Sequence, residues 1–360
     1  MIQEPRYMFV IKDASGNQYE FQKATERAYE HYENDVGRCR FFVPYNDLKL
    51  TTSSVVDNAF SEILIYRNET LVWQGMVQMI QDVVDGVLVY GETYLAALAW
   101  YGVRYDQEYT TANISTLIGN EYDNIVGRAS DFLQAKITKG TIENPYQTDT
   151  TNALTVTRTL FNESFLNVLK EMVAVSKGEE TSTWSQNTVF DISFSATAPT
   201  FTFKRNAGSA KADVIFELDS EIVDFNIVTD MRYITNESKG FVVTEGPKIL
   251  TSTESAATSA STWYRRESYP YYPNVTSQAD LDHLVDNVVA NGKSPGVSMN
   301  LKFAAGLAPL DGYSISDNVK LRIKRGRIDI DEYRKVVGME VNIDNAGVEN
   351  TVPILQKLRT

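Results

Sequence analysis

The fold of this chain is decided by residues 48–103, and above all by the run EILIYRNETLVWQGMVQMIQDVVDGVLVYGETYLAALAWY at residues 62–101. Short apolar runs alternate here with polar turns, which predicts a series of short strands. The pair Asn68-Glu69 separates the first two runs and predicts a turn. Asp85-Gly86 between apolar runs is a strong hairpin signal. Gly75 lies inside a strand, where it predicts a bulge or a bend.

The hydrophobic period changes at the end of this run. Tyr94, Leu95, Leu98 and Tyr101 recur every three to four residues, as on one face of a helix. The stretch therefore predicts a set of strands followed by one short helix.

Upstream, residues 7–21 predict another strand, turn and strand. Residues 22–40 are polar and charged, and Ala24, Ala28 and Tyr32 are spaced by four. This segment predicts either a short helix or a loop.

The composition indicates a β-rich globular protein. A chain of 360 residues is long enough for two to three domains with a sizeable core. The 20 tyrosines and 16 phenylalanines suit strands, because aromatic side chains pack well on a pleated surface.

The net charge of −13 disfavours a basic surface that binds free nucleic acid. An acidic surface suits a conduit through which DNA passes without sticking, and it suits ordinary solubility even better. The charge is uneven, because residues 1–120 carry 9 Lys/Arg against 16 Asp/Glu, whereas residues 319–340 carry 7 against 4.

Cysteine and histidine are too scarce for a common metal site. Cys39 is the single cysteine, so an internal disulfide is excluded, and two histidines cannot complete a Cys/His cage. We expect no cofactor. The first ten residues do not resemble a signal peptide, and no run approaches the roughly 20 apolar residues of a membrane-spanning helix. We expect synthesis in the cytoplasm.

Residues 104–206 predict a mixed segment of helices and strands. A helical pattern begins at residues 113–118, and a second apolar face runs over residues 165–173. Asn162 is the expected N-cap of this second helix, and Gly178 its expected end.

Alternating strands return over residues 189–243 and again over residues 297–343. Between them, the Ser/Thr/Ala-rich residues 251–262 predict a loop. Residues 277–292 predict a helix, with Ser277 as N-cap and Gly292 after its end.

The order of these elements resembles phage tail hub proteins. The resemblance rests on the Arg-Asn-Glu turn, the WQGMV and VLVYG strands and the YLAAL helix. A second, distant match is Asp224-Phe225-Asn226, then Asp230, Asn236 and the strand at residues 240–243. A third is the late order of helix, Pro-containing loop and Asp-x-Val-x-Leu-x-Ile strand.

The resemblance implies a β-rich α+β fold with two tube-like β-barrels. Residues 1–103 would form the first barrel, and residues 104–206 an α+β insert. Residues 207–250 and 296–350 would form the second barrel. Residues 251–295 would be a loop and helix excursion from it.

Catalytic motifs are missing from the sequence. It contains no dinucleotide-binding, phosphate-binding or nucleophile-elbow glycine motif. His283 among Asp280, Asp282 and Asp286 suggests a metal or acid–base cluster, but a solvated helix face explains it better. His31 has the same ordinary explanation. We expect no enzyme activity.

Two basic segments are candidates for a subunit interface. Lys320, Arg322 and Lys324 alternate with apolar residues, so their charges share one strand face. A solvent-exposed face, a contact with the acidic first barrel of a neighbouring subunit and a nucleic-acid groove remain open for them. The second segment contains Trp263, Arg265 and Arg266 beside a Tyr/Pro cluster; it suits an interface anchor or a carbohydrate-stacking site.

The resemblance implies a structural virion protein at the tail tip. It would be a homotrimer that caps the tail tube and adapts its six-fold symmetry to a three-fold tip. Its partners would be the tail tube or distal tail ring and the tip spike or fibre proteins, and DNA would pass through its lumen without specific binding. The alternatives are a tail-tip hydrolase acting on cell wall or polysaccharide, and a module that binds a host glycan or receptor.

Overall fold

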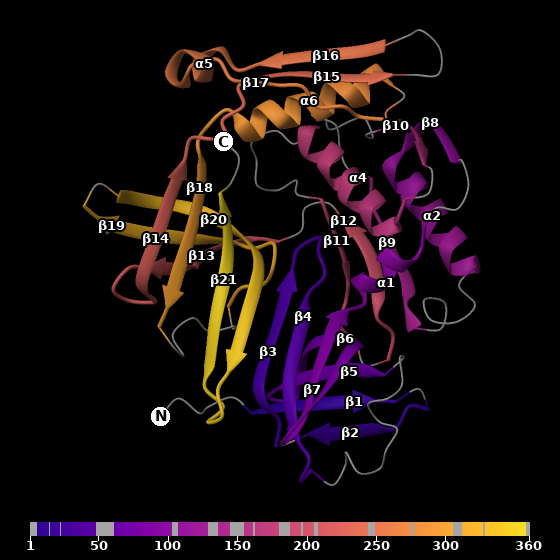
Figure 1. Cartoon of the computed structure of the whole chain (residues 1–360), viewed down its shortest axis with the longest axis vertical. Coiled ribbons are helices and arrows are strands. Elements are labelled where there is room, and N and C mark those ends of the chain that lie inside the picture. Colours follow the sequence, from indigo (N-terminus) through magenta and orange to yellow (C-terminus); the bar gives the residue numbers. More distant parts are fainter. Residues whose placement is uncertain are drawn as a thin grey trace.

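The computed structural model of the chain describes residues 6–13, 15–21, 23–47, 61–102, 107–128, 136–144, 155–160, 163–179, 188–195, 197–204, 208–243, 249–273, 275, 277–304, 312–326 and 328–357. Strands account for 56% and helices for 19% of the structure, which confirms the expected β-rich α+β class. The buried side chains form four hydrophobic cores. These cores define the four units described below, and Figure 1 shows their arrangement.

The first unit is antiparallel throughout. Its strands are β1 (Tyr7–Lys12), β2 (Gln18–Phe21), β3 (Thr25–Tyr32), β4 (Arg38–Pro44), β5 (Glu62–Arg67), β6 (Thr70–Val83) and β7 (Gly86–Thr93). The predicted turn at Asn68-Glu69 is confirmed, and both residues have left-handed φ angles of 48° and 67°. The prediction for residues 22–40 was wrong, because β3 is a strand held between two others.

Gly75 is required by close packing within β6. A Cβ atom at this position would lie 2.1 Å from the backbone oxygen of Glu92 on β7. The bulge that the sequence led us to expect lies nearby, where the β6–β7 register shifts between Val77 and Met79. The indole of Trp73 is buried in the core of this unit and donates to the backbone oxygen of Glu30 at 2.9 Å.

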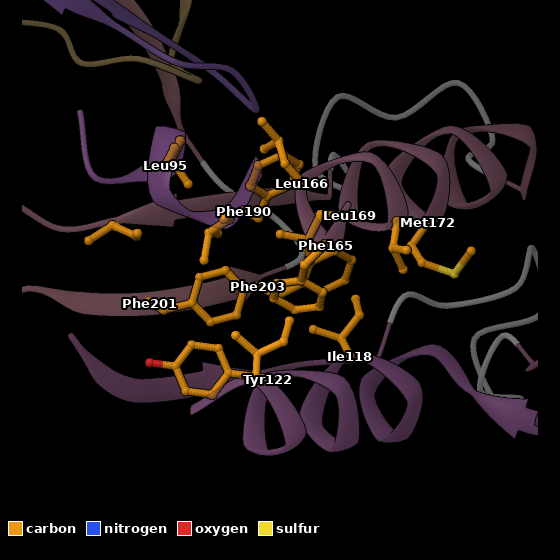
Figure 2. Close-up of a cluster of buried hydrophobic side chains, with 14 of the residues drawn as sticks. Leu95, Ile118, Tyr122, Phe165, Leu166, Leu169, Met172, Phe190, Phe201 and Phe203 are labelled. Atoms are coloured by element: carbon orange, nitrogen blue, oxygen red, sulfur yellow. The ribbon is translucent and has the colours of Figure 1, made fainter. Parts of the chain in front are cut away.

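The insert packs helices against short strands. It comprises β8 (Gln107–Asn113), α2 (Ile114–Arg128), β9 (Thr138–Ile142), β10 (Thr155–Leu160), α4 (Phe165–Glu179), β11 (Val189–Ile192) and β12 (Thr200–Lys204). Helix α1 (Leu95–Trp100), which ends the segment predicted as the first barrel, packs into the same core. Its core is aromatic: Tyr122 stacks on Phe201 with ring centroids 5.0 Å apart, and Phe165 lies at 6.1 Å from Phe201 (Figure 2). Gly178 lies within α4 and does not end it, and Asn162 lies outside the described residues.

The second unit contains β13 (Ala210–Glu217), β14 (Ile222–Asp230), β18 (Gly296–Phe303), β19 (Asn318–Arg325), β20 (Ile328–Ile343) and β21 (Glu349–Lys357). Its core includes Phe216, whose ring contacts Phe303 and Tyr313 at 5.1 and 5.5 Å. β14 and β18 pair with each other as an antiparallel ribbon.

One sheet joins the first and second units. β20 pairs with β3 over six residue pairs, from Gly338↔Tyr32 to Ile343↔Arg27. Val341 and Ile343 of β20 therefore lie in the core of the first unit. Among the described strands, the order runs from β13 to β2 without closing on itself, so no closed barrel is seen.

The remaining unit, after the first unit, the insert and the second unit, is a sheet with a helix on one face. It contains β15 (Glu237–Val243), β16 (Ile249–Ser255), α5 (Ala257–Trp263), β17 (Glu267–Ser268) and α6 (Gln278–Gly292). Figure 1 shows it at the end of the molecule opposite the first unit. Ser277 is the N-cap of α6, as predicted, and accepts from the backbone N–H of Asp280. The predicted loop at residues 251–262 was wrong, because β16 and α5 occupy most of it.

Candidate interaction surfaces

The basic face predicted for β19 is present in the structure, but carboxylates of the same chain neutralise it. Val319, Leu321 and Ile323 are fully buried, so the side chains between them point outward. Figure 1 shows β19 on the side of the molecule away from the insert, and in the sheet it lies between β13 and β20. Asp331 on β20 lies 2.9 Å from Lys320 and 3.6 Å from Arg322.

Further carboxylates complete this compensation. Arg322 also pairs with Glu217 of β13 at 3.3 Å, and Lys324 with Asp329 of β20 at 3.7 Å. The hydrogen bond from Lys320 lowers the pKa of Asp331. On this face each of the three cations therefore lies beside a carboxylate. The strand does not present an uncompensated basic groove for nucleic acid.

Trp263 and Arg265, which the sequence grouped in one segment, lie in different environments. Trp263 ends α5 and is half-buried, and the backbone N–H of Arg266 donates to the side-chain oxygen of Asn236 at 2.8 Å. Arg265 lies on the outer face of the β15–β17 sheet, where it contacts Glu237 and Glu267 at 2.5 and 2.7 Å. The structure thus separates Arg265 from Trp263 and joins it to β15.

Arg265 belongs to a four-residue charge network. Lys239 lies 3.2 Å from Glu237 and 3.6 Å from Glu267, so two cations and two carboxylates share one site. The hydrogen bond from Arg265 lowers the pKa of Glu237, and the hydrogen bond from the Tyr269 hydroxyl lowers the pKa of Glu267. We call these four residues the charge quartet.

Beside the charge quartet lies an apolar surface, of which the sequence indicated only the tyrosines of the Tyr/Pro cluster. It consists of the exposed side chains of Phe241, Val243, Ile249, Tyr269 and Tyr271. The rings of Phe241 and Tyr271 lie 5.2 Å apart. The alternation at residues 237–243 was a sequence signal for β15, but the position of the tyrosines depends on a parallel pairing of β15 with β17.

A cleft of about 630 Å³ lies where the first unit, the insert and the second unit meet. His31 borders it, 3.8 Å from Asp191 and with its ring 4.8 Å from that of Phe194. Glu33 is buried there and is paired with Lys335 at 2.6 Å. The Tyr313 hydroxyl is buried and has no hydrogen-bond partner among the described atoms.

A second pocket, of about 390 Å³, lies over the β20–β3–β4 junction. Glu30 and Glu340 are directly opposite each other across the strands, and the Tyr32 hydroxyl donates to Glu340 at 3.1 Å. Burial, and after it the neighbouring Glu340, raises the pKa of Glu30. This is a pair of carboxylates with unequal surroundings.

The residues around His283 have structural roles. Asp280 accepts from the backbone N–H of Thr157 at 3.2 Å, and Asp282 accepts from Gln278 at 2.8 Å. Across the described part of the chain, no group of three or more His, Cys, Asp and Glu side chains is placed to hold a metal ion. No helix in the described ranges is both long and apolar enough to cross a membrane.

No protein-family model and no curated protein matches the chain. Solved structures match over nearly the whole length. A tail protein from Neisseria meningitidis aligns with a TM-score of 0.63 at 11% identity, covering 98% of this chain and 96% of the other. The chain shares the fold of this tail protein.

Two further tail proteins agree. The 43 kDa tail protein of prophage MuSo2 from Shewanella oneidensis has a TM-score of 0.64 at 12% identity, covering 97% of this chain and 98% of its own. The prophage tail protein gp18 from Listeria monocytogenes has a TM-score of 0.60 at 10% identity, with coverages of 98% and 95%. The sequence predicted a resemblance to phage tail proteins, and these likenesses of fold confirm it.

Proposed function

We propose that the chain is a tail hub, or baseplate hub, of a tailed phage or a related particle. It would cap the tail tube, adapt six-fold tube symmetry to a three-fold tip and let DNA pass at infection. The observation that carries this proposal is the likeness of fold to tail proteins, which spans 97–98% of the chain and includes every unit.

The arrangement of the sheets supports this role. The first and second units are both built mainly from antiparallel strands, and the β3–β20 pairing makes them one continuous sheet. Three copies of such a pair would present six sheet units around one axis, which is the geometry that a symmetry adapter requires. We propose that residues 1–103, and residues 207–250 with 296–350, serve as the two barrel-like units of each subunit. Residues 104–206 and 251–295 would be their insertions.

The charge of the chain supports passage of DNA without binding. The net charge is −13, and carboxylates compensate Lys320, Arg322 and Lys324 of β19. Phosphate binding requires uncompensated Lys and Arg side chains, since these displace counterions from DNA. We propose that the lumen repels DNA weakly, and that the chain works at the tail tip of the virion beside tube or distal ring and spike or fibre proteins.

The oligomeric state tests this proposal. Light scattering of the purified protein should give a mass near three chains, and negative-stain images should show three-fold rings. A monomer at every concentration up to the solubility limit would overturn the trimer.

A second candidate, a tail-tip hydrolase, is favoured by one observation. Glu30 and Glu340 share a pocket, and the pKa of Glu30 is raised, as in the acid of a glycosidase pair. A zymogram on bacterial cell walls decides it: clearing by the wild type that is lost in Glu30→Gln would support a hydrolase. No clearing by the wild type would reject it.

A further inference from the structure

The β15–β16–β17 sheet has one covered face and one bare face. On the covered face, Val242 packs against Leu281 and Val285 of α6. Gly240 lies so close to the helix that an added Cβ would be 2.3 Å from the side chain of Val285. Figure 1 shows α6 on one side of β15 and β16 only, at the end of the molecule.

The bare face is ordered in rows by the strand pairing. Glu237 lies beside Glu267, and Phe241 lies between Thr251 and Tyr271. The next row pairs Val243 with Ile249. The face therefore runs from a charged end to an aromatic middle and an aliphatic end.

This face breaks the usual pattern of a solvated sheet. An antiparallel sheet with one face on a core normally carries polar residues on the other. Here the exposed fractions are 52% for Val243, 58% for Ile249, 60% for Tyr269 and 51% for Tyr271. Contiguous apolar surface of this kind marks an interaction site.

The charges of the face identify its partner. The charge quartet contains two cations and two carboxylates, so the face is locally neutral, although the chain carries −13. Copies of so acidic a chain repel each other over most of their surface. They meet at the lowest electrostatic cost where the local charge is zero and apolar side chains can be buried.

The face is also held in place before any contact is made. The charge quartet fixes Lys239 and Arg265, and the Tyr269 hydroxyl is bonded to Glu267. Tyr and Arg side chains that are already ordered lose little entropy on binding, which makes them effective anchors.

We infer that this face is a subunit contact, covered by a second copy of this chain. The inference rests on the proposed homotrimer and names one surface through which its copies meet. In a closed three-fold ring, each contact joins different surfaces of two copies. Phe241, Tyr269 and Tyr271 would be buried against the neighbouring subunit.

The test compares association of the wild type with that of a double variant, Phe241→Asp with Tyr271→Asp. Both positions are exposed and belong to none of the hydrophobic cores, so the subunit fold should survive, which an unchanged far-UV circular dichroism spectrum would show. The expected result is a shift from trimer to monomer, with association at least about 100-fold weaker. Val84→Asp, at a position 93% exposed on the β6–β7 hairpin, is the matched control and should keep the trimer.

Hydrogen exchange adds a measurement without substitutions. Amides of residues 237–243 and 249–255 should gain protection as the wild-type concentration rises through the association range. A double variant that remains trimeric would overturn this contact and leave the proposed hub intact. A wild type that remains monomeric would overturn the trimer itself, and with it the second copy as the occupant.

Discussion

The side chain of Asn236 fixes the backbone on both sides of Arg265. Its Nδ2 donates to the carbonyl oxygen of Tyr264 at 2.7 Å, and its Oδ1 accepts from the N–H of Arg266 at 2.8 Å. Asn236 is fully buried, and Tyr264 has a φ of 63°, a conformation that costs energy for a bulky residue. The side-chain amide of Asn236 thus holds the turn that places Arg265 beside Glu237 and Glu267 of the charge quartet.

Asn236→Ala should release this turn. The substitution removes two hydrogen bonds that a fully buried side chain makes to the backbone, so we expect a loss of about 2 kcal/mol of stability. The measurement is the denaturant midpoint together with exchange of the Arg266 amide, which should become fast. Asn226→Ala, at an exposed position on β14, is the control and should change neither quantity. Equal effects of the two substitutions would contradict the role given to Asn236.

Gly75→Ala should destabilise the first unit. The added methyl would lie 2.1 Å from the backbone oxygen of Glu92 and 2.5 Å from the Trp73 ring, and neither can move freely. We expect a cost of about 1–3 kcal/mol. Gly119→Ala in α2 is the matched control: its nearest neighbour would be the Lys139 ammonium at 3.6 Å, so helix propensity should raise stability by up to about 1 kcal/mol. Thermal unfolding of both variants checks that the two substitutions change the stability in opposite directions.

The buried ion pair of Glu33 and Lys335 should be needed for the stability of the junction between the first and second units. Both side chains are almost fully buried, and the Ser316 hydroxyl also donates to Glu33. Lys335→Met would leave a buried carboxylate uncompensated, at a cost of about 3–5 kcal/mol. The double variant Glu33→Gln with Lys335→Met should recover most of this loss, because no buried charge remains. Lys324→Met, which breaks an exposed pair, should cost less than about 1 kcal/mol in the same denaturation assay.

The sequence predicted the features that depend on local chemistry. Asn68-Glu69 makes its turn because polar residues accept left-handed backbone, and Ser277 caps α6 through a bond to an amide three residues away. The outward face of Lys320, Arg322 and Lys324 follows from strand alternation alone. What alternation could not predict was the carboxylates opposite them, since Glu217 and Asp331 come from other strands.

The errors arose where distant segments decide local structure. Residues 25–32 have the spacing of a helix, but pairing with β20, about 300 residues later in the chain, holds them as β3. Tyr269 and Tyr271 belong to the Tyr/Pro cluster that the sequence suggests as an interface anchor or a carbohydrate-stacking site. Their rings reach the bare sheet face only because β17 pairs in parallel with β15. Neither pairing has a signature within its own segment.

Glu30→Gln should stabilise the protein at neutral pH. Burial and the facing Glu340 raise the pKa of Glu30, so the folded state binds a proton more tightly than the unfolded state does. Such a group supports folding below its unfolded pKa, near 4.5, and loses this contribution as pH rises through the folded pKa. Glu30 and Glu340 lie directly opposite each other across the strands, where like charges destabilise, and replacing Glu30 should add about 0.5 kcal/mol at pH 7. Denaturant titrations at pH 7 and pH 4 check this, because the gain should shrink towards zero in acid. Glu254→Gln, exposed on β16, should show no such pH-dependent difference, and a destabilised Glu30→Gln at pH 7 would refute the repulsion.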